Sequence, residues 1–279
     1  MSALTSSLSG VRSSPLVRAV RDGNVVAQRN FVKIRRVPEI LVAVLLSPIM
    51  FVLLFAYVFG GAINPGYGVS YREFLIGGIF AQTVVFGSTF TGAGLAEDMQ
   101  KGIIDRFRSL PMSRAGVLVG RTASDLVYNI LSLAIMAATG LLVGWRVHGP
   151  VLHTVAAFAL LLAFAYAFSW VMAFVGLMVP SVEVINNAAF IVIMPLTFVS
   201  NAFVPLASFP SALRPFVEWN PVSAVTQACR QLFGNTNPAA TVPNVWSMQH
   251  PVLYTLAWIV VLVAVFAPLS IARFRRTSR

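Results

Sequence analysis

Residues 151–179 read VLHTVAAFALLLAFAYAFSWVMAFVGLMV, an apolar run that contains no Asp, Glu, Lys or Arg. An α-helix rises 1.5 Å per residue, so about 20 apolar residues cross the hydrocarbon core of a bilayer, which is about 30 Å thick. This run exceeds that length. The stretch therefore predicts a transmembrane helix and indicates an integral membrane protein.

Similar apolar runs recur on both sides of this one. Hydrophobic residues make up 57% of the chain and charged residues 10%, whereas soluble domains have about 25% charged residues. The predicted fold is all-α, with one membrane domain over residues 40–271. We expect six transmembrane helices at about 40–59, 74–95, 115–144, 151–179, 184–204 and 252–271.

Basic residues flank the apolar runs and are distributed asymmetrically. If the N-terminus is cytoplasmic, most Lys and Arg residues fall on the cytoplasmic side, and the outer side keeps only Arg72, Arg146, Arg214 and Arg230. This is the positive-inside pattern, so we predict two cytoplasmic termini and a basic tail at 272–279. The net charge of +11 follows from this topology and does not predict a nucleic-acid partner.

An amphipathic pattern precedes the first predicted span. Its apolar residues share one helical face: Leu16, Val20, Ala27, Phe31 and Ile34. Basic residues gather on the opposite face, so residues 1–39 predict a cytoplasmic segment with a helix in the membrane interface, against anionic lipid. Gly23 and Asn24 interrupt the pattern, so a solvated basic leader is the alternative.

A second amphipathic stretch, residues 97–110, lies between the second and third predicted spans. Its apolar face consists of Met99, Ile103, Phe107 and Leu110. The helix should end at Leu110, because the residue before a proline avoids the α region and Pro111 follows. Such a helix predicts a groove on a partner protein; a connecting helix in the membrane interface is the alternative.

Residues 201–234, between the fifth and sixth predicted spans, combine prolines with aromatic residues. These include Phe203, Pro205, Pro210, Phe216, Trp219 and Pro221. Asn220 and Pro221 are typical of the N-cap and first position of a helix. We predict a pair of short helices at the outer leaflet or in a shallow re-entrant segment. An ordinary loop with surface aromatics is the alternative.

Polar side chains within the predicted spans are candidates for a substrate path through the membrane. They are Gln82, Thr83, Ser88, Thr89, Asn129, Asn186 and Asn187. Polar residues in spans often serve helix packing instead, and both interpretations stay open.

Two acidic residues bear on the energy source of transport. Asp125 lies in the inner half of the third predicted span, and Glu183 lies in the turn between the fourth and fifth. If both face a cytoplasmic vestibule, we expect pairing with Arg121 or Arg114; interfacial charges near helix ends are the alternative. An ion-coupled transporter needs titratable groups near the bilayer centre. The predicted spans place none clearly at that depth, so ion-coupled transport is only the second candidate function.

The sequence offers no pattern for catalysis or metal binding. Cys229 is the single cysteine, and the three histidines form no metal-binding spacing such as HExxH. We therefore predict no catalytic residue, no metal site and no cofactor in this chain. The phosphate-binding pattern G-x-x-x-x-G-K-[ST] is also missing from the sequence.

Two stretches resemble the permease subunits of type 2 ABC exporters, closest to the daunorubicin-resistance type of bacterial drug and lipid exporters. They are EDMQKGIIDRFRSLPMS, from Glu97 to Ser113, and NAFVPLASFPSALRPFVEWNPVSAVTQACR, from Asn201 to Arg230. The resemblance implies a permease of the bacterial plasma membrane that dimerises with an identical or related chain. It also implies two copies of a separate ATPase that bind ATP and Mg²⁺, and a hydrophobic drug, glycolipid or lipid-like substrate.

The same resemblance assigns roles to residues. Residues 97–110 would form the coupling helix that contacts the ATPase, with these coupling residues: Glu97, Met99, Gly102, Ile103, Asp105, Phe107, Leu110 and Pro111. The outer re-entrant segment would include Phe203, Pro205, Pro210, Trp219, Asn220 and Pro221.

Overall fold

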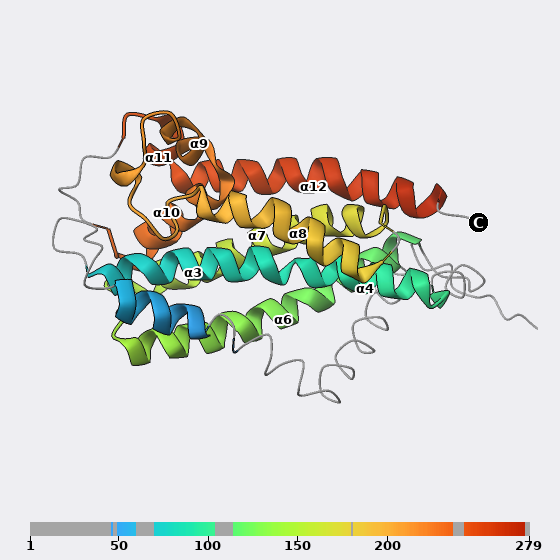
Figure 1. Cartoon of the computed structure of the whole chain (residues 1–279), viewed down its shortest axis with the longest axis horizontal. Helices are drawn as coiled ribbons and strands as arrows, with labels where there is room; N and C mark the ends of the chain where they lie inside the picture. The colour runs from blue at the N-terminus through green and yellow to red at the C-terminus, as the bar shows by residue number, and fades with distance from the viewer. Residues whose placement is uncertain are drawn as a thin grey trace, which may run out of the picture.

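The computed structural model describes residues 46, 49–59, 70–103, 114–179, 181–236 and 243–276. All regular structure within these ranges is helical, which confirms the all-α fold. The predicted interfacial helix before residue 40 lies outside the described residues. The long helices run along one axis, and short helices gather at one end (Figure 1).

The short helices define what we call the capped end, residues 200–236 and 243–250. It contains α9 (Arg214–Trp219), α10 (Pro221–Phe233) and α11 (Trp246–Gln249). The opposite end, where the last helix finishes, is called the C-terminal end of the bundle (Figure 1).

Four helical segments among the described residues are long and apolar enough to cross a membrane. The helices that form them are α3 (Tyr71–Gly87) with α4 (Thr89–Gln100), then α6 (Arg114–Val143), α7 (Val151–Gly176) and α12 (Pro251–Arg276). Two shorter apolar helices, Ile49–Val58 and α8 (Val182–Phe198), coincide with the first and fifth predicted spans. The chain is thus a multi-pass membrane protein, and the count of six spans stays a prediction.

Helix α7 lies at the centre of the bundle and packs against α3, α4, α6, α10 and α12. Small residues allow its close approach to α4. A Cβ atom on Gly176 would lie 2.6 Å from the carbonyl oxygen of Gly92. Membrane helices depend on such close van der Waals contacts, because there is no hydrophobic driving force for helices to associate within lipid.

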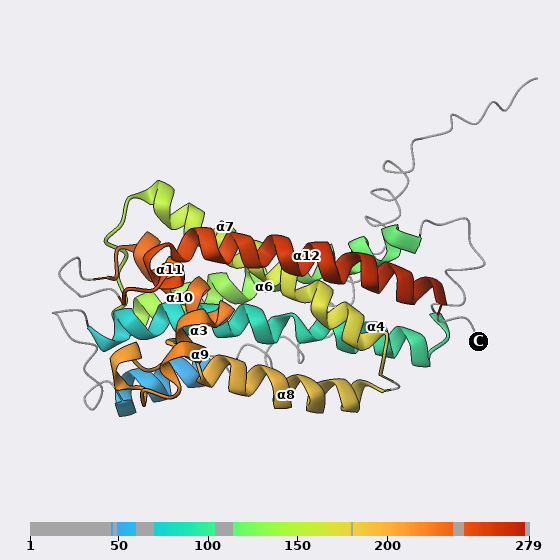
Figure 2. The same cartoon turned by 90° about the horizontal axis from the view of Figure 1, so that it is seen from above.

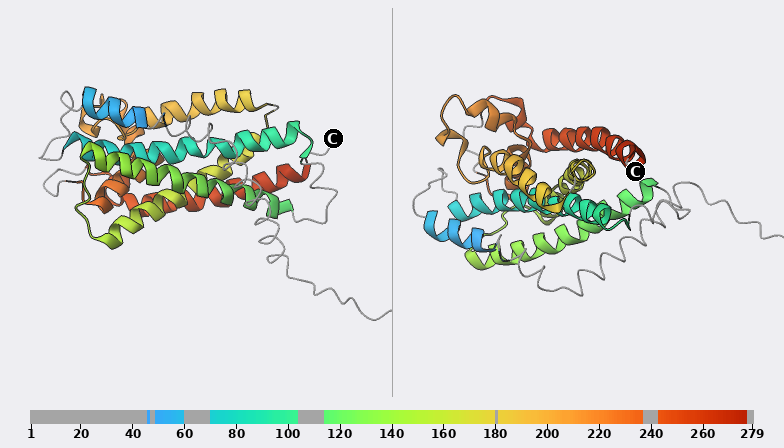
Figure 3. Two further views of the ribbon diagram at one scale, coloured as in Figure 1. Left: turned by 90° about the horizontal axis from the view of Figure 1, so that it is seen from below. Right: turned by 45° about the vertical axis from the view of Figure 1, so that its right-hand side comes forward.

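Helix α8 lies along α4, on the same side of the bundle as the helix Ile49–Val58 (Figures 2 and 3). One face of α8 is buried, at intervals of four residues: Ile185, Ala189, Ile193 and Thr197. The ring of Phe203 contacts Phe55 and Phe198, with centroids 5.0 and 5.2 Å away. This aromatic contact joins the two shorter helices near the capped end.

Two apolar cores hold the long helices together. The larger contains an aromatic cluster in which the ring of Phe80 contacts Trp145, Phe158 and Phe233, with centroids 5.4 to 5.8 Å apart. The smaller lies toward the C-terminal end of the bundle. It is made by Leu95, Leu118, Trp170, Ala173, Leu177 and Phe274.

Candidate functional site

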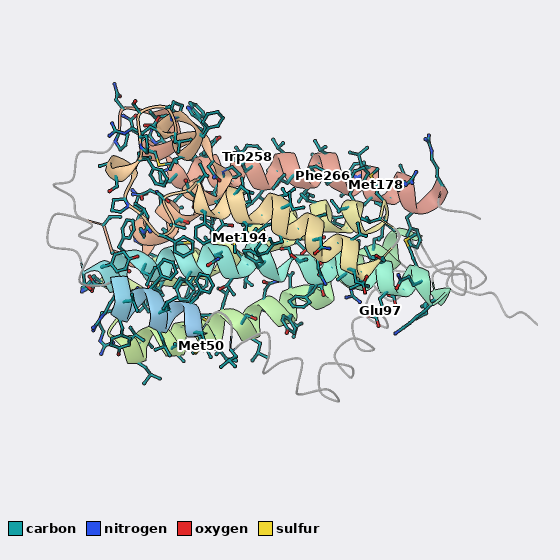
Figure 4. The ribbon with its side chains drawn as sticks, in the orientation of Figure 1. Met50, Glu97, Met178, Met194, Trp258 and Phe266 are labelled. Carbon is teal, nitrogen blue, oxygen red and sulfur yellow. The ribbon has the colours of Figure 1, made fainter. Side chains whose placement is uncertain are left out.

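The last turns of α4 carry the first predicted coupling residues. Helix α4 ends at Gln100, and Gly102 follows with φ of +64°, a left-handed conformation that favours glycine. Glu97 and Met99 therefore belong to the same helix as the second span, near its end (Figure 4). The prediction of one continuous helical face from Met99 to Leu110 is wrong at Gly102.

The other coupling residues can be placed only in part. Ile103 follows the Gly102 turn and is half-buried. Four further predicted coupling residues lie outside the described residues: Asp105, Phe107, Leu110 and Pro111. Lys101 Nζ donates a hydrogen bond to Glu97 Oε1 at 2.5 Å, a contact one turn apart at the end of α4, which continues beyond the predicted end of the span at Leu95.

The smaller apolar core connects the end of α4 to three other helices. Leu95 of α4 packs in a cluster with Leu118 of α6, Trp170 of α7 and Phe274 of α12, and Met99 packs against this cluster. The Ser270 hydroxyl also donates to the Trp170 carbonyl oxygen at 3.3 Å. A force on the residues after Gln100 would therefore reach four helices through packed side chains.

A group of polar contacts joins α4 to α6, and we call it the α4–α6 clasp: the buried side chains of Thr91 and Asp125, the half-buried Arg121 and the backbone carbonyl of Phe90. Arg121 Nη2 donates to the Phe90 carbonyl oxygen at 3.1 Å, and the Thr91 hydroxyl donates to Asp125 Oδ2. Arg121 Nε lies 3.7 Å from Asp125 Oδ2. The expected pairing of Asp125 with Arg121 is confirmed, whereas Glu183 is exposed in the first turn of α8.

The predicted substrate-path residues do not form one group. Gln82 and Thr83 are buried on α3. The Ser88 hydroxyl, between α3 and α4, donates to the carbonyl oxygens of Val84 and Ala165, so it serves helix packing against α7. Asn129 is buried on α6, where its amide donates to the Asp125 carbonyl oxygen at 3.0 Å.

The asparagines of α8 lie beside its buried face and not on it. Asn186 and Asn187 are exposed, whereas Ile185, directly before them, is fully buried. Successive helical residues are turned by about 100°, so a shift of one position moves a side chain off the buried face. Asn186 therefore lies off the buried face of α8 in the single chain, and its place on a substrate path stays a prediction.

The predicted helix start in the capped end is confirmed. Asn220 is the N-cap of α10, its Oδ1 accepts from the Val222 N–H at 2.8 Å, and Pro221 holds the first helical position. The Asn220 amide also donates to two carbonyl oxygens at the end of α8, those of Leu196 and Val199, both at 2.7 Å. One side chain thus caps two helices, and the predicted pair of short helices is present as α9 and α10.

Arg230 is the largest polar side chain buried in the capped end, with 2% of its surface exposed. Its Nε donates to the Phe74 carbonyl oxygen at 2.8 Å and its Nη2 to that of Ala202 at 2.9 Å. The guanidinium carbon also lies 3.5 Å from the centroid of the Phe74 ring, a cation–π contact. From the sequence, Arg230 was predicted to lie on the outer side of the membrane, but its contacts with Phe74 and Ala202 were not predicted.

The remaining residues of the predicted outer segment divide into buried and exposed positions. The Phe203 ring is buried, and its carbonyl oxygen accepts from the Tyr71 hydroxyl at 3.2 Å. Pro205 is half-buried at the start of a short 3₁₀ turn, Leu206–Ser208, and Pro210 is exposed. Trp219 is 49% exposed and its ring contacts Tyr254 of α12.

A second asparagine, Asn235, joins the capped end to the loop between α6 and α7. Its Oδ1 accepts from the Trp145 indole N–H at 3.0 Å, and its amide donates to the Arg146 carbonyl oxygen at 2.8 Å. Gly234, with φ of +72°, ends α10 just before it. The short helices are therefore held against α3, α8 and the α6–α7 loop by polar side chains bonded to backbone groups.

Comparison with protein families identifies this architecture. Residues 23–233 match the model of the ABC-2 type transporter family. The chain belongs to this family. Among relatives of this ABC-2 permease, the daunorubicin resistance ABC transporter permease protein DrrB1 of Streptomyces coeruleorubidus is 33% identical over 250 residues, which cover 90% of this chain and 84% of that protein.

More distant relatives cover somewhat less of the ABC-2 permease. The doxorubicin resistance ABC transporter permease protein DrrB of Mycobacterium tuberculosis is 26% identical over 77% of this chain and 74% of its own length. The putative transport permease ycf38 of the alga Porphyra purpurea is 23% identical over 78% of this chain and 76% of its own length. The expected resemblance to type 2 ABC permeases is confirmed.

Proposed function

We propose that the chain is the membrane-spanning subunit of an ATP-driven exporter and is not itself an enzyme. Its membership of the ABC-2 family supports a permease role. Because the sequence lacks the phosphate-binding pattern, a separate ABC ATPase would bind ATP and Mg²⁺. Two ATPase copies and a second permease, identical or related, would complete the complex.

The observation that carries this proposal is the connection of the α4 end to the rest of the bundle. Helix α4 runs without a break to Gln100, and Leu95 and Met99 pack in the apolar core shared with α6, α7 and α12. An ATPase bound to the residues that follow Gln100 would displace a helix that is packed against three others. Packed interfaces transmit such displacements because they have discrete arrangements.

The orientation that suits this mechanism places the C-terminal end of the bundle in the cytoplasm. Lys101, Arg273 and Arg276 lie at that end, and Arg72, Arg146 and Arg214 lie in or beside the capped end. The described bases are compatible with the positive-inside rule in this orientation. The capped end would then face outward, with exposed aromatic residues such as Phe216 and Trp219 at the membrane interface.

For the cargo we propose a hydrophobic drug, a glycolipid or a lipid-like molecule. Two relatives are named for resistance to daunorubicin or doxorubicin, which supports this class. Within the described spans, polar side chains such as Ser88 bond to neighbouring backbone rather than converge on one site. A polar, highly charged cargo would need more partners than these helices offer.

The test is purification of the tagged chain in lipid from cells that carry its own ABC ATPase, with Phe107→Asp as the variant. A charge in an apolar docking contact should reduce the co-purified ATPase and its activity by about tenfold or more. Phe216→Asp is the matched control, because Phe216 is 70% exposed on α9 at the opposite end. It should leave the association unchanged.

Two results would count against the proposal. If no ATPase co-purifies with the wild-type chain, the ABC mechanism fails, and transport driven by an ion gradient becomes the function to test, through Asp125. If the ATPase binds equally well to the wild type and to Phe107→Asp, the permease role survives but the docking site does not lie in residues 97–110.

A further inference from the structure

The two charges of the α4–α6 clasp lie on the same helix. Arg121 and Asp125 are one turn apart on α6, and their side chains are only 14% and 10% exposed. Their contacts to α4 are made separately, by Arg121 to the Phe90 carbonyl oxygen and by Asp125 to the Thr91 hydroxyl. A separation of α6 from α4 would therefore break two hydrogen bonds but leave both charges beside each other.

The surface of α4 is shaped to receive Arg121. A Cβ atom on Gly94 would lie 1.8 Å from Arg121 Nη2, so the guanidinium occupies the space that a side chain would fill. In a helix, the side chain of residue i+4 usually lies over the carbonyl group of residue i, because side chains lean toward the N-terminus. Glycine at position 94 leaves the Phe90 carbonyl open to a second donor.

The hydrogen bonding of this interface is incomplete in the arrangement observed. Arg121 Nε is buried without a hydrogen bond, since its distance of 3.7 Å to Asp125 Oδ2 exceeds hydrogen-bond length. On these two helices, three more buried polar atoms have no hydrogen-bond partner: Thr89 Oγ1 of α4, and Tyr128 Oη and Asn129 Oδ1 of α6. Such atoms also occur elsewhere in the described residues, for example Thr83 Oγ1 of α3 and Arg230 Nη1 of the capped end. Buried unsatisfied groups are uncommon in native proteins and call for an explanation.

We propose that the α4–α6 interface opens during transport. Arg121 and Asp125 are positioning residues in this motion, because they remain paired on α6 when it separates from α4. The inference rests on the proposed function, because the ATPase supplies the displacement of α4. In the closed arrangement, Arg121 reaches across Gly94 to α4. In the open arrangement, Arg121 Nε closes onto Asp125 at hydrogen-bond length, so that no unpaired charge is left in the bilayer.

Two substitutions should act in opposite directions. Asp125→Asn removes the charge that neutralises Arg121 in the open arrangement, so α6 stays bound to α4 through the Phe90 carbonyl. Gly94→Ala places a methyl group where the Arg121 guanidinium lies, so it favours the open arrangement. Gly140→Ala on α6 is the matched control, because its Cβ would meet the end of the Ile76 side chain at 3.3 Å and nothing closer.

The experiment measures the rate of disulfide formation between Phe90→Cys and Tyr128→Cys, with Cys229→Ala to remove the native thiol. The two native rings lie 5.1 Å apart across the α4–α6 interface. The complex with its ATPase, in lipid, is oxidised with copper phenanthroline without nucleotide and after trapping with ATP and vanadate. We expect trapping to slow disulfide formation by about fivefold, a usual size for coupling between two sites.

The variants then separate the possible outcomes. Asp125→Asn should keep the fast rate in the trapped state, Gly94→Ala should be slow even without nucleotide, and Gly140→Ala should behave as the parent. A rate that trapping does not slow, or two variants that shift it in the same direction, would overturn the inference. If ATP is hydrolysed normally in that case, the proposed function stands; if no hydrolysis is associated with the chain, both fail.

Discussion

Two buried asparagines show how differently two regions of the molecule use polar groups. In the capped end, Asn220 bonds through both its carbonyl and its amide, to Val222 of α10 and to two carbonyls of α8. In the α4–α6 interface, Asn129 donates only within its own helix, and its Oδ1 has no hydrogen-bond partner. The first side chain fixes two elements to each other, whereas the second fixes nothing between α4 and α6.

The two buried arginines repeat this contrast. Arg230 Nη1 is buried without a hydrogen bond, but Nε and Nη2 bond to carbonyl oxygens of α3 and of the segment after α8. Moving any of these elements would therefore leave a buried charge with fewer partners. Arg121 has its acidic partner, Asp125, one turn away on the same helix. This difference in partners supports our proposal that the α4–α6 interface opens while the capped end stays fixed.

The largest expected effect on stability is that of Arg230→Ala. It removes the cation–π contact to Phe74 and leaves two buried carbonyl oxygens without their donor, which should cost about 3 kcal/mol of unfolding free energy. The measurement is an SDS titration in mixed micelles. Arg214→Ala, at an exposed arginine of the same end, is the control and should cost less than about 1 kcal/mol. Equal losses for the two variants would contradict a fixing role for Arg230.

Asn220→Ala should have an intermediate effect. The loss of the N-cap of α10 and of two bonds to α8 should lower the unfolding free energy by about 2 kcal/mol. Asn220→Ser retains an acceptor for the N-cap but not the amide donors, so it should recover about half of the loss. The same titration checks both variants. An Asn220→Ala protein as stable as wild type would contradict the claim that Asn220 fixes α10 to α8.

Asn129→Ala should have the smallest effect, below about 1 kcal/mol. The substitution removes one bond within α6 together with an acceptor that is already unsatisfied, and these two changes partly offset each other. Unfolding of this variant in the same micelles should follow the wild type closely. A loss as large as that of Asn220→Ala would mean that the α4–α6 interface is as fixed as the capped end.

Local sequence patterns predicted the features that depend on neighbouring residues. Asn220 followed by Pro221 gave the start of α10, because capping involves groups only two or three residues apart. For Asp125 the sequence left two partners open, Arg121 and Arg114, and the structure pairs it with Arg121, one helical turn away. The apolar runs also located the four long membrane helices, to within a few residues at their ends.

Features that depend on distant backbone groups could not be predicted. The carbonyl partners of Arg230 lie at Phe74 and Ala202, and a carbonyl oxygen leaves no mark in the sequence because every residue has one. The sequence also predicted a span ending at Leu95 and a separate helix from Glu97, whereas α4 continues through both to Gln100.

The most direct test compares disulfide formation in the two regions under the same conditions. One cysteine pair replaces Phe90 and Tyr128 in the α4–α6 interface, and the other replaces Trp219 and Tyr254, whose rings lie 5.7 Å apart at the capped end. Trapping with ATP and vanadate should slow the first pair and leave the second unchanged. Equal responses of the two pairs, or a response of the capped end alone, would contradict a fixed cap beside a moving α4–α6 interface.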